Sequence, residues 1–203
     1  LDVSSGILSL NGTYAPSASA RTRFATAGTA AGTGCGRLVA SGALTLALLR
    51  AVGPGGRVVS VEVRSDHLTH ARTAIRRFLG DLPDNLVLVE GRVEEVLPGW
   101  TPDRVILDLP EPWEVAEPAA AALAHGGVLC AYLPTVPQVQ RLHDVLRATR
   151  RFVAVETFEM MIRDWKIDGR SVRPESMMVG HTGFITIAHH AAESLAPESS
   201  DPA

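Results

Sequence analysis

From residue 41 to residue 189, short stretches rich in Val, Ile and Leu alternate with stretches of helical periodicity. Strands are expected at 57–63, 86–89, 104–109, 128–133, 152–157 and 183–189, and helices at 41–52, 66–79, 112–124 and 136–149. Because successive parallel strands need a helix between them, this alternation predicts an α/β fold with a mainly parallel, doubly wound sheet. A long loop without a helix, running to about residue 181, separates the last two strands. It predicts that these strands close the sheet as an antiparallel pair.

The first 40 residues lack this pattern, and 24 of them are Ala, Ser, Thr or Gly. We therefore expect an irregular segment over 1–40, one folded domain over 41–190 and a disordered tail over 191–203. No run approaches the roughly 18 apolar residues of a membrane span, and the first residues do not have the basic start of a signal peptide. These features predict a soluble, cytoplasmic protein. The net charge of −3 argues against wholesale electrostatic binding of nucleic acid, but it is compatible with a local basic patch.

Two acidic residues stand at the ends of expected strands, where a parallel sheet binds its ligands. Glu62 can accept hydrogen bonds from both ribose hydroxyls of a nucleoside cofactor; the alternative is an ion pair with Arg64. Asp108 lies in the segment LDLPEPW and must point out of the strand end, because burial of an unpaired acid is costly. The alternative for Asp108 is to cap the following helix. Trp113 is a candidate wall of the same pocket.

A glycine-rich loop that approaches a cofactor can be placed in two registers. Gly32, Gly34 and Gly36 have the G-x-G-x-G form, but the residues before them make a poor strand. Ser41 and Gly42 form the other register, which lies near the expected 20 residues before Glu62 but has no glycine pattern upstream. Both registers stay open. The dehydrogenase form G-x-G-x-x-G fails because position 37 is Arg, which argues against an NAD-dependent enzyme.

Several segments together carry a family resemblance over about residues 41–188, and the most specific are DLPEPW and RPE…GHTGF. The chain resembles the TrmI-type tRNA (adenine-N1) methyltransferases, notably the actinobacterial ones. The other segments are RVVSVEVRSDHLTHARTAIRRF, LPDNLVLVEGRV and GGVLCAYLPTVPQV. The resemblance implies a Rossmann-like class I methyltransferase fold, S-adenosyl-L-methionine as cofactor, N1 of adenosine 58 in the tRNA T-loop as acceptor, and a homotetramer.

The same resemblance implies a role for particular residues. Glu62 matches the acid that binds the ribose, His67 a neighbouring cofactor contact, and Asp108 the acid at the junction of cofactor and target base. Asp108 would accept a hydrogen bond from the adenine amino group and then take the proton released when N1 is alkylated. The target base must be extruded from the folded tRNA to reach it. Without the resemblance, His67 and His70 would be neighbours on a solvated helix face, and no third ligand makes them a metal site.

Six arginines are candidates for RNA contact, and two residues before the last strand are candidates for the pocket of the target base. Each arginine can bind a phosphate through two hydrogen bonds, or it can belong to a solvated face of an arginine-rich protein. His181 and Thr182 either line the base pocket or turn the chain into its last strand. The candidate arginines are Arg147, Arg150 and Arg151 at one helix end, and Arg163, Arg170 and Arg173 in the late loop.

Three departures from the family favour an alternative, in which the chain is an inactive remnant that oligomerises or binds RNA. Residues 1–40 are expected to be too short and too weakly patterned to supply the β-rich N-terminal domain of the family. The first strand and its glycine loop are replaced by the Ala-, Ser-, Thr- and Gly-rich segment, and a likeness that begins at Ser41 is typical of a truncated or mis-framed gene. Arg92 stands where the family usually has an Asp that contacts the cofactor adenine, and arginine cannot accept that hydrogen bond.

Overall fold

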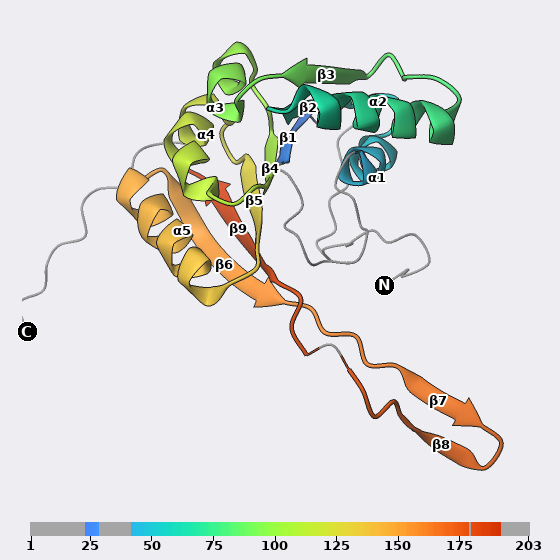
Figure 1. Ribbon diagram of the computed structural model, residues 1–203. Helices are drawn as coiled ribbons and strands as arrows, with labels where there is room; N and C mark the ends of the chain where they lie inside the picture. The colour runs from blue at the N-terminus through green and yellow to red at the C-terminus, as the bar shows by residue number, and fades with distance from the viewer. Residues whose placement is uncertain (1–22, 29–41, 179, 192–203) are drawn as a thin grey trace, which may run out of the picture.

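Within the described part of the chain, seven strands form one sheet, as the computed structural model shows (Figure 1). The structure describes residues 23–28, 42–178 and 180–191. Four pairs of neighbours are parallel, and the last described strand along the sequence pairs antiparallel with both of its neighbours. This confirms the predicted α/β fold and the closing antiparallel strands. The order across the sheet is β3 (Leu86–Glu90), β2 (Arg57–Glu62), β1 (Arg23–Gly28), β4 (Arg104–Asp108), β5 (Val128–Leu133), β9 (Phe184–His190) and β6 (Phe152–Glu159).

Strand β1 corrects the prediction that the first strand of the fold is replaced by an irregular segment. It lies in the middle of the sheet, paired with β2 on one side and β4 on the other. The sequence RFATAG has weak strand propensity. Its ladders use backbone N–H and C=O groups, which nearly every residue supplies, so two flanking strands can hold a segment that would not form a strand alone.

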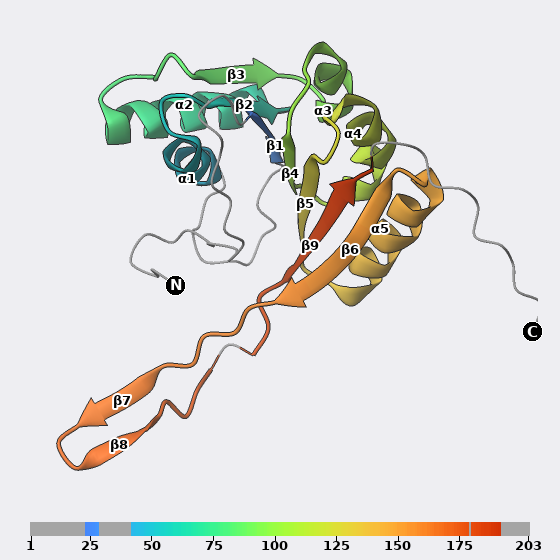
Figure 2. The same cartoon turned by 180° about the vertical axis from the view of Figure 1, so that it is seen from behind.

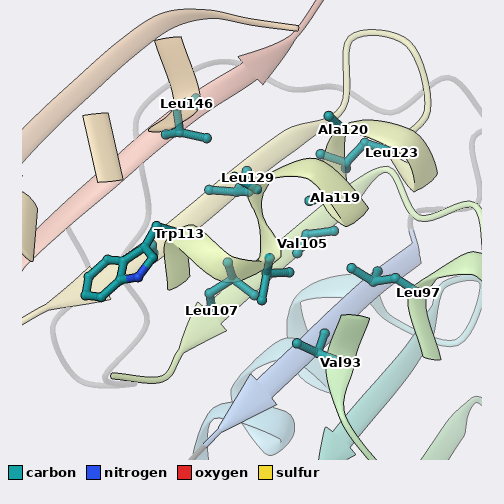
Figure 3. Packing of buried hydrophobic residues seen from close by; sticks show 14 of the residues in the cluster. Val93, Leu97, Val105, Leu107, Trp113, Ala119, Ala120, Leu123, Leu129 and Leu146 are labelled. Carbon is teal, nitrogen blue, oxygen red and sulfur yellow. The ribbon is translucent and has the colours of Figure 1, made fainter. Parts of the chain in front are cut away.

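Helices cover both faces of the sheet (Figures 1 and 2). Each face has its own cluster of buried apolar side chains. On one face, α1 (Ala43–Val52) and α2 (Ser65–Leu79) pack, and Leu48 and Leu49 bury themselves against Val58. The larger cluster lies on the other face, where Leu107 and Leu129 are fully buried. Figure 3 shows its side chains meeting between the sheet and the helices. The helical elements on that face are α3 (Val93–Val96), η2 (Leu97–Gly99), η3 (Pro112–Val115), α4 (Ala116–Ala122) and α5 (Val136–Thr149).

Most element predictions hold within two residues, and those for β5 and α5 agree at both ends. Helix α1 begins at Ala43 with Gly42 as its N-cap. The helix expected at 112–124 is divided into η3 and α4. No described helix is long and apolar enough to span a membrane.

The expected late loop instead contains a hairpin, which we call the arm: residues 160–178, with strands β7 (Trp165–Asp168) and β8 (Ser171–Pro174). Asp168 pairs with Ser171, so the turn consists of Gly169 and Arg170. Gly169 has φ 55°, a conformation that glycine adopts readily. A glycine at the first position of a two-residue turn, here Gly169, is a sequence signal for such a hairpin. The arm leaves the carboxyl end of β6 and extends away from the main sheet (Figures 1 and 2).

Candidate functional site

The two predicted acids lie on either side of the last residue of β1. In the strand register, Gly28 pairs with Glu62 of β2 and also with Asp108 of β4. Because neighbouring strands are about 4.8 Å apart, the Cα atoms of the two acids are separated by about 10 Å across the carboxyl end of the sheet. The structure therefore brings together the two residues that the sequence analysis placed in one site.

Glu62 is held by one backbone N–H and keeps its carboxylate partly exposed. Its side chain is 14% exposed; Oε1 accepts a hydrogen bond from the Arg64 N–H at 3.0 Å, and Oε2 lies 3.8 Å from Nδ1 of His67. The Arg64 guanidinium does not pair with Glu62 as the alternative proposed. It donates to Asp66, at 2.6 Å, and this hydrogen bond lowers the pKa of Asp66 to about 2. Glu62 is thus oriented, with acceptor capacity left for a diol.

Asp108 is partly buried at the end of β4, and burial raises the pKa of its carboxyl above the ordinary value. The N-cap of the next helical element is Glu111, with no side-chain cap bond, so Asp108 does not play the capping role that was the alternative. A carboxylate with a raised pKa is a better proton acceptor. Trp113 is not a wall of the open pocket: its ring is buried in the larger cluster, with the Arg141 guanidinium carbon 4.3 Å from the ring centroid.

A hollow of about 210 Å³ lies beside Glu62, at the carboxyl ends of β2, β3 and β4. Its apolar walls come from Val61, Val63 and Leu109, among others. Its polar side carries Arg92, which contacts Glu94 through Nε and lies 3.7 Å from Glu114 through a terminal nitrogen. Three glutamates and one arginine line the hollow, since Glu111 is also present. This charge balance disfavours phosphate groups and suits an uncharged or cationic nucleoside.

The GHTGF segment joins the ends of three strands beside the site. His181 contacts the Glu159 carboxylate through Nδ1, and its Nε2 lies 2.8 Å from the Pro134 carbonyl oxygen. Tyr132 donates its hydroxyl to the Thr182 carbonyl at 2.6 Å. These three contacts hold the turn into β9. A role of His181 and Thr182 in lining a base pocket stays a prediction.

The remaining candidates are divided between the site and more distant regions. Gly32, Gly34, Gly36 and Ser41 lie outside the described residues. Gly42 is buried, and a Cβ there would lie 3.3 Å from the Ala71 carbonyl oxygen, so close packing on α2 accounts for this glycine. No three His, Cys, Asp or Glu side chains gather as a metal site among the described residues.

The two groups of arginines lie at different ends of the sheet. Helix α5 runs from the carboxyl end of β5 to the start of β6, so Arg147, Arg150 and Arg151 lie at the amino end, opposite the acids. The second group lies on the arm, which leaves from the same end of the sheet as the site: Arg163, Arg170 and Arg173.

The fold is that of the class I S-adenosylmethionine-dependent methyltransferases. Within that class, the chain belongs to the family described as tRNA methyltransferase complex GCD14 subunit, whose model matches residues 22–178. The match includes β1, so the likeness begins well before Ser41, where the sequence analysis placed its onset.

Relatives in other organisms have the same fold or clear sequence similarity. The tRNA (adenine(58)-N(1))-methyltransferase TrmI of Thermus thermophilus is 40% identical over 146 residues, covering 71% of this chain and 56% of that protein. The tRNA (adenine(57)-N(1)/adenine(58)-N(1))-methyltransferase TrmI of Methanocaldococcus jannaschii is 32% identical over 179 residues, covering 76% and 63%. The structure of tRNA (m1A58) methyltransferase TrmI from Aquifex aeolicus superposes with a TM-score of 0.68 at 25% identity, covering 85% of this chain and 63% of that one. The chain thus spans about three fifths of the length of these relatives.

Proposed function

We propose that this chain transfers a methyl group from S-adenosylmethionine to N1 of adenosine 58 in tRNA. The observation that carries the proposal is the placement of Glu62 and Asp108 on either side of Gly28, next to a hollow that has apolar walls and a charged side. Family membership supports the choice of tRNA as substrate. A cytoplasmic location belongs to the same proposal, because tRNA is the substrate.

The residues fit the cofactor. Glu62 has a carboxylate oriented by the Arg64 N–H and suited to the two ribose hydroxyls, and His67 lies beside it. The hollow lined by Val61, Val63 and Leu109 offers apolar contact to a flat base. When bound, S-adenosylmethionine supplies an activated methyl group on a sulfonium.

Asp108 has the catalytic role. Its carboxylate accepts a hydrogen bond from the 6-amino group of the target adenine, which makes N1 more electron-rich. After N1 is alkylated, the amino group becomes more acidic, and Asp108 takes its proton. Burial raises the pKa of Asp108, which makes the carboxylate a stronger base for this step. The remaining acceleration comes from positioning N1 in line with the methyl group.

The test combines calorimetric titration with S-adenosylmethionine and methylation of unmodified tRNA, with the product mapped by primer-extension arrest. We expect binding at micromolar concentration and methylation at adenosine 58. Asp108→Asn should lower the methylation rate by about 10²- to 10⁴-fold with little change in cofactor binding. Asp84→Asn, at an exposed position remote from the hollow, is the control and should leave the rate unchanged.

Two results would contradict the proposal. Unchanged turnover in Asp108→Asn would show that the proton acceptor is another group. Absence of cofactor binding at millimolar concentration would favour the inactive remnant, acting as a non-catalytic oligomerising or RNA-binding subunit.

The arm supports the proposal that the active form is a homo-oligomer, with a tetramer implied by the family resemblance. Ile162, Trp165 and Ile167 are exposed on it, and Ile167 is 77% exposed. A two-stranded hairpin with no layer behind it is marginally stable in water. Apolar surface of this kind marks a site of protein–protein contact, and an arm from a second copy would cover it.

A further inference from the structure

Arg92 brings a carboxylate to the polar side of the hollow, where the cofactor base would lie. Arg92 and Glu94 both line this hollow, and Nε of Arg92 contacts Oε1 of Glu94. A terminal nitrogen of Arg92 lies 3.7 Å from Oε2 of Glu114, which reaches the hollow from η3 on the other side. The guanidinium is therefore held between two acids that belong to different walls.

The two acids differ in their surroundings. The Glu94 side chain is 25% exposed, and that of Glu114 is 49% exposed. Glu94 follows Val93, which is buried at the start of α3 and fixes the backbone there. A hydrogen bond to the less exposed carboxylate is screened less by water. Glu94 is thus the better placed acceptor, while Glu114 helps to hold the guanidinium.

The pairing of a guanidinium with a carboxylate matches one edge of adenine. The 6-amino group of adenine donates hydrogen bonds, and the adjacent ring nitrogen N1 accepts one. Arg92 can only donate, and an ionised Glu94 can only accept. The edge of hypoxanthine is reversed, because its 6-oxo group accepts and its N1–H donates.

We propose that Glu94 accepts the hydrogen bond from the 6-amino group of the cofactor adenine, with Arg92 as the positioning residue that orients its carboxylate. This inference rests on the proposed function, since it assigns the base-reading residue of that cofactor site. Arg92 does not accept the bond itself; it holds the acceptor two residues along the chain. Glu94 is then the residue that distinguishes an adenosyl cofactor from its inosyl analogue.

The experiment measures dissociation constants of S-adenosylhomocysteine and S-inosylhomocysteine by calorimetry, with the full chain and its variants. Hydrogen bonds to charged groups predict that the unaltered chain prefers the adenosyl ligand by about 10- to 100-fold. Glu94→Gln keeps the side-chain shape but provides both a donor and an acceptor. We expect this variant to bind the two ligands within about threefold of each other, because its amide can pair with either edge.

Glu95→Gln is the matched control, since Glu95 is the next residue of the same short helix and is exposed outside the hollow. It should keep the preference of the unaltered chain. Arg92→Met should weaken adenosyl binding and reduce the preference, because the carboxylate loses its orientation. Circular dichroism of each variant shows whether it is folded.

The outcomes separate this inference from the proposed function. If the unaltered chain binds the adenosyl ligand and Glu94→Gln retains the full preference, Glu94 does not read the base, and the cofactor site stands without it. If the unaltered chain binds neither ligand at millimolar concentration, the cofactor site and this inference both fail.

Discussion

At the scale of single residues, His181 has a hydrogen-bond acceptor at each ring nitrogen. The Pro134 carbonyl and the Glu159 carboxylate, in that order of effect, raise the pKa of His181. Both bonds require a proton on the ring nitrogen, so together they favour the imidazolium. A folded-state pKa above the unfolded value contributes stability that is complete below about pH 6.5 and is lost as pH rises through the folded pKa. We therefore expect the melting temperature to fall over this range more steeply in the unaltered chain than in His181→Gln.

Thermal unfolding followed by circular dichroism checks this expectation. The measurements run from about pH 5.5 to about pH 8.5, a range that brackets the ordinary histidine pKa. His70→Gln, on an exposed helix face, is the control and should keep the steep dependence. Parallel curves for the unaltered chain and His181→Gln would show that the contacts of His181 with Pro134 and Glu159 do not titrate as described.

At the scale of secondary-structure elements, the turn before β5 depends on a glycine for reasons of space. A Cβ at Gly127 would lie 2.7 Å from the Ala124 carbonyl oxygen and 2.9 Å from a methyl carbon of Leu123. The backbone oxygen cannot move without disturbing the turn, so Gly127→Ala should lower the free energy of unfolding by about 1–3 kcal/mol. At Gly55, before β2, a Cβ would meet nothing within 4 Å, and Gly55→Ala should change it by less than about 1 kcal/mol. Urea denaturation measures the free energy of unfolding of both variants. Equal losses in Gly127→Ala and Gly55→Ala would contradict the steric account.

At the scale of the whole molecule, the arm extends away from the main sheet and exposes apolar side chains. Ile162 and Ile167 are exposed on it, and their burial between copies would be the main source of association. We expect the unaltered chain to sediment as an oligomer and Ile162→Glu/Ile167→Glu to sediment as a monomer with an intact fold. Phe78→Glu, at an exposed apolar position on α2, is the control and should leave the oligomer unchanged. An unaltered chain that stays monomeric over the measured concentrations would refute the role of the arm.

Local pattern was enough for much of the fold and part of the site. Strand β5 and helix α5 were predicted to the residue because an apolar run and an amphipathic period mark them without help from distant contacts. Glu62 and Asp108 were predicted to share a site because the carboxyl ends of parallel strands meet at one edge. The side-chain contacts around them were not predictable: the alternative ion pair of Glu62 with Arg64 does not form. The choice of Asp66 over Glu62 by Arg64 depends on the geometry of the turn into α2.

The features that only the tertiary structure decides lie where segments distant in sequence meet. Strand β1 has weak intrinsic preference and becomes a strand because β2 and β4 provide backbone partners on both sides. The grouping of Arg92 with Glu114 depends on how α3 and η3 pack, and no spacing in the sequence encodes that distance. Hydrophobic periodicity is a property of residues close together in the sequence, so the sequence alone reveals it. Contacts between elements depend on the free energy of the whole fold, so they are determined only when the sheet and its helices pack together.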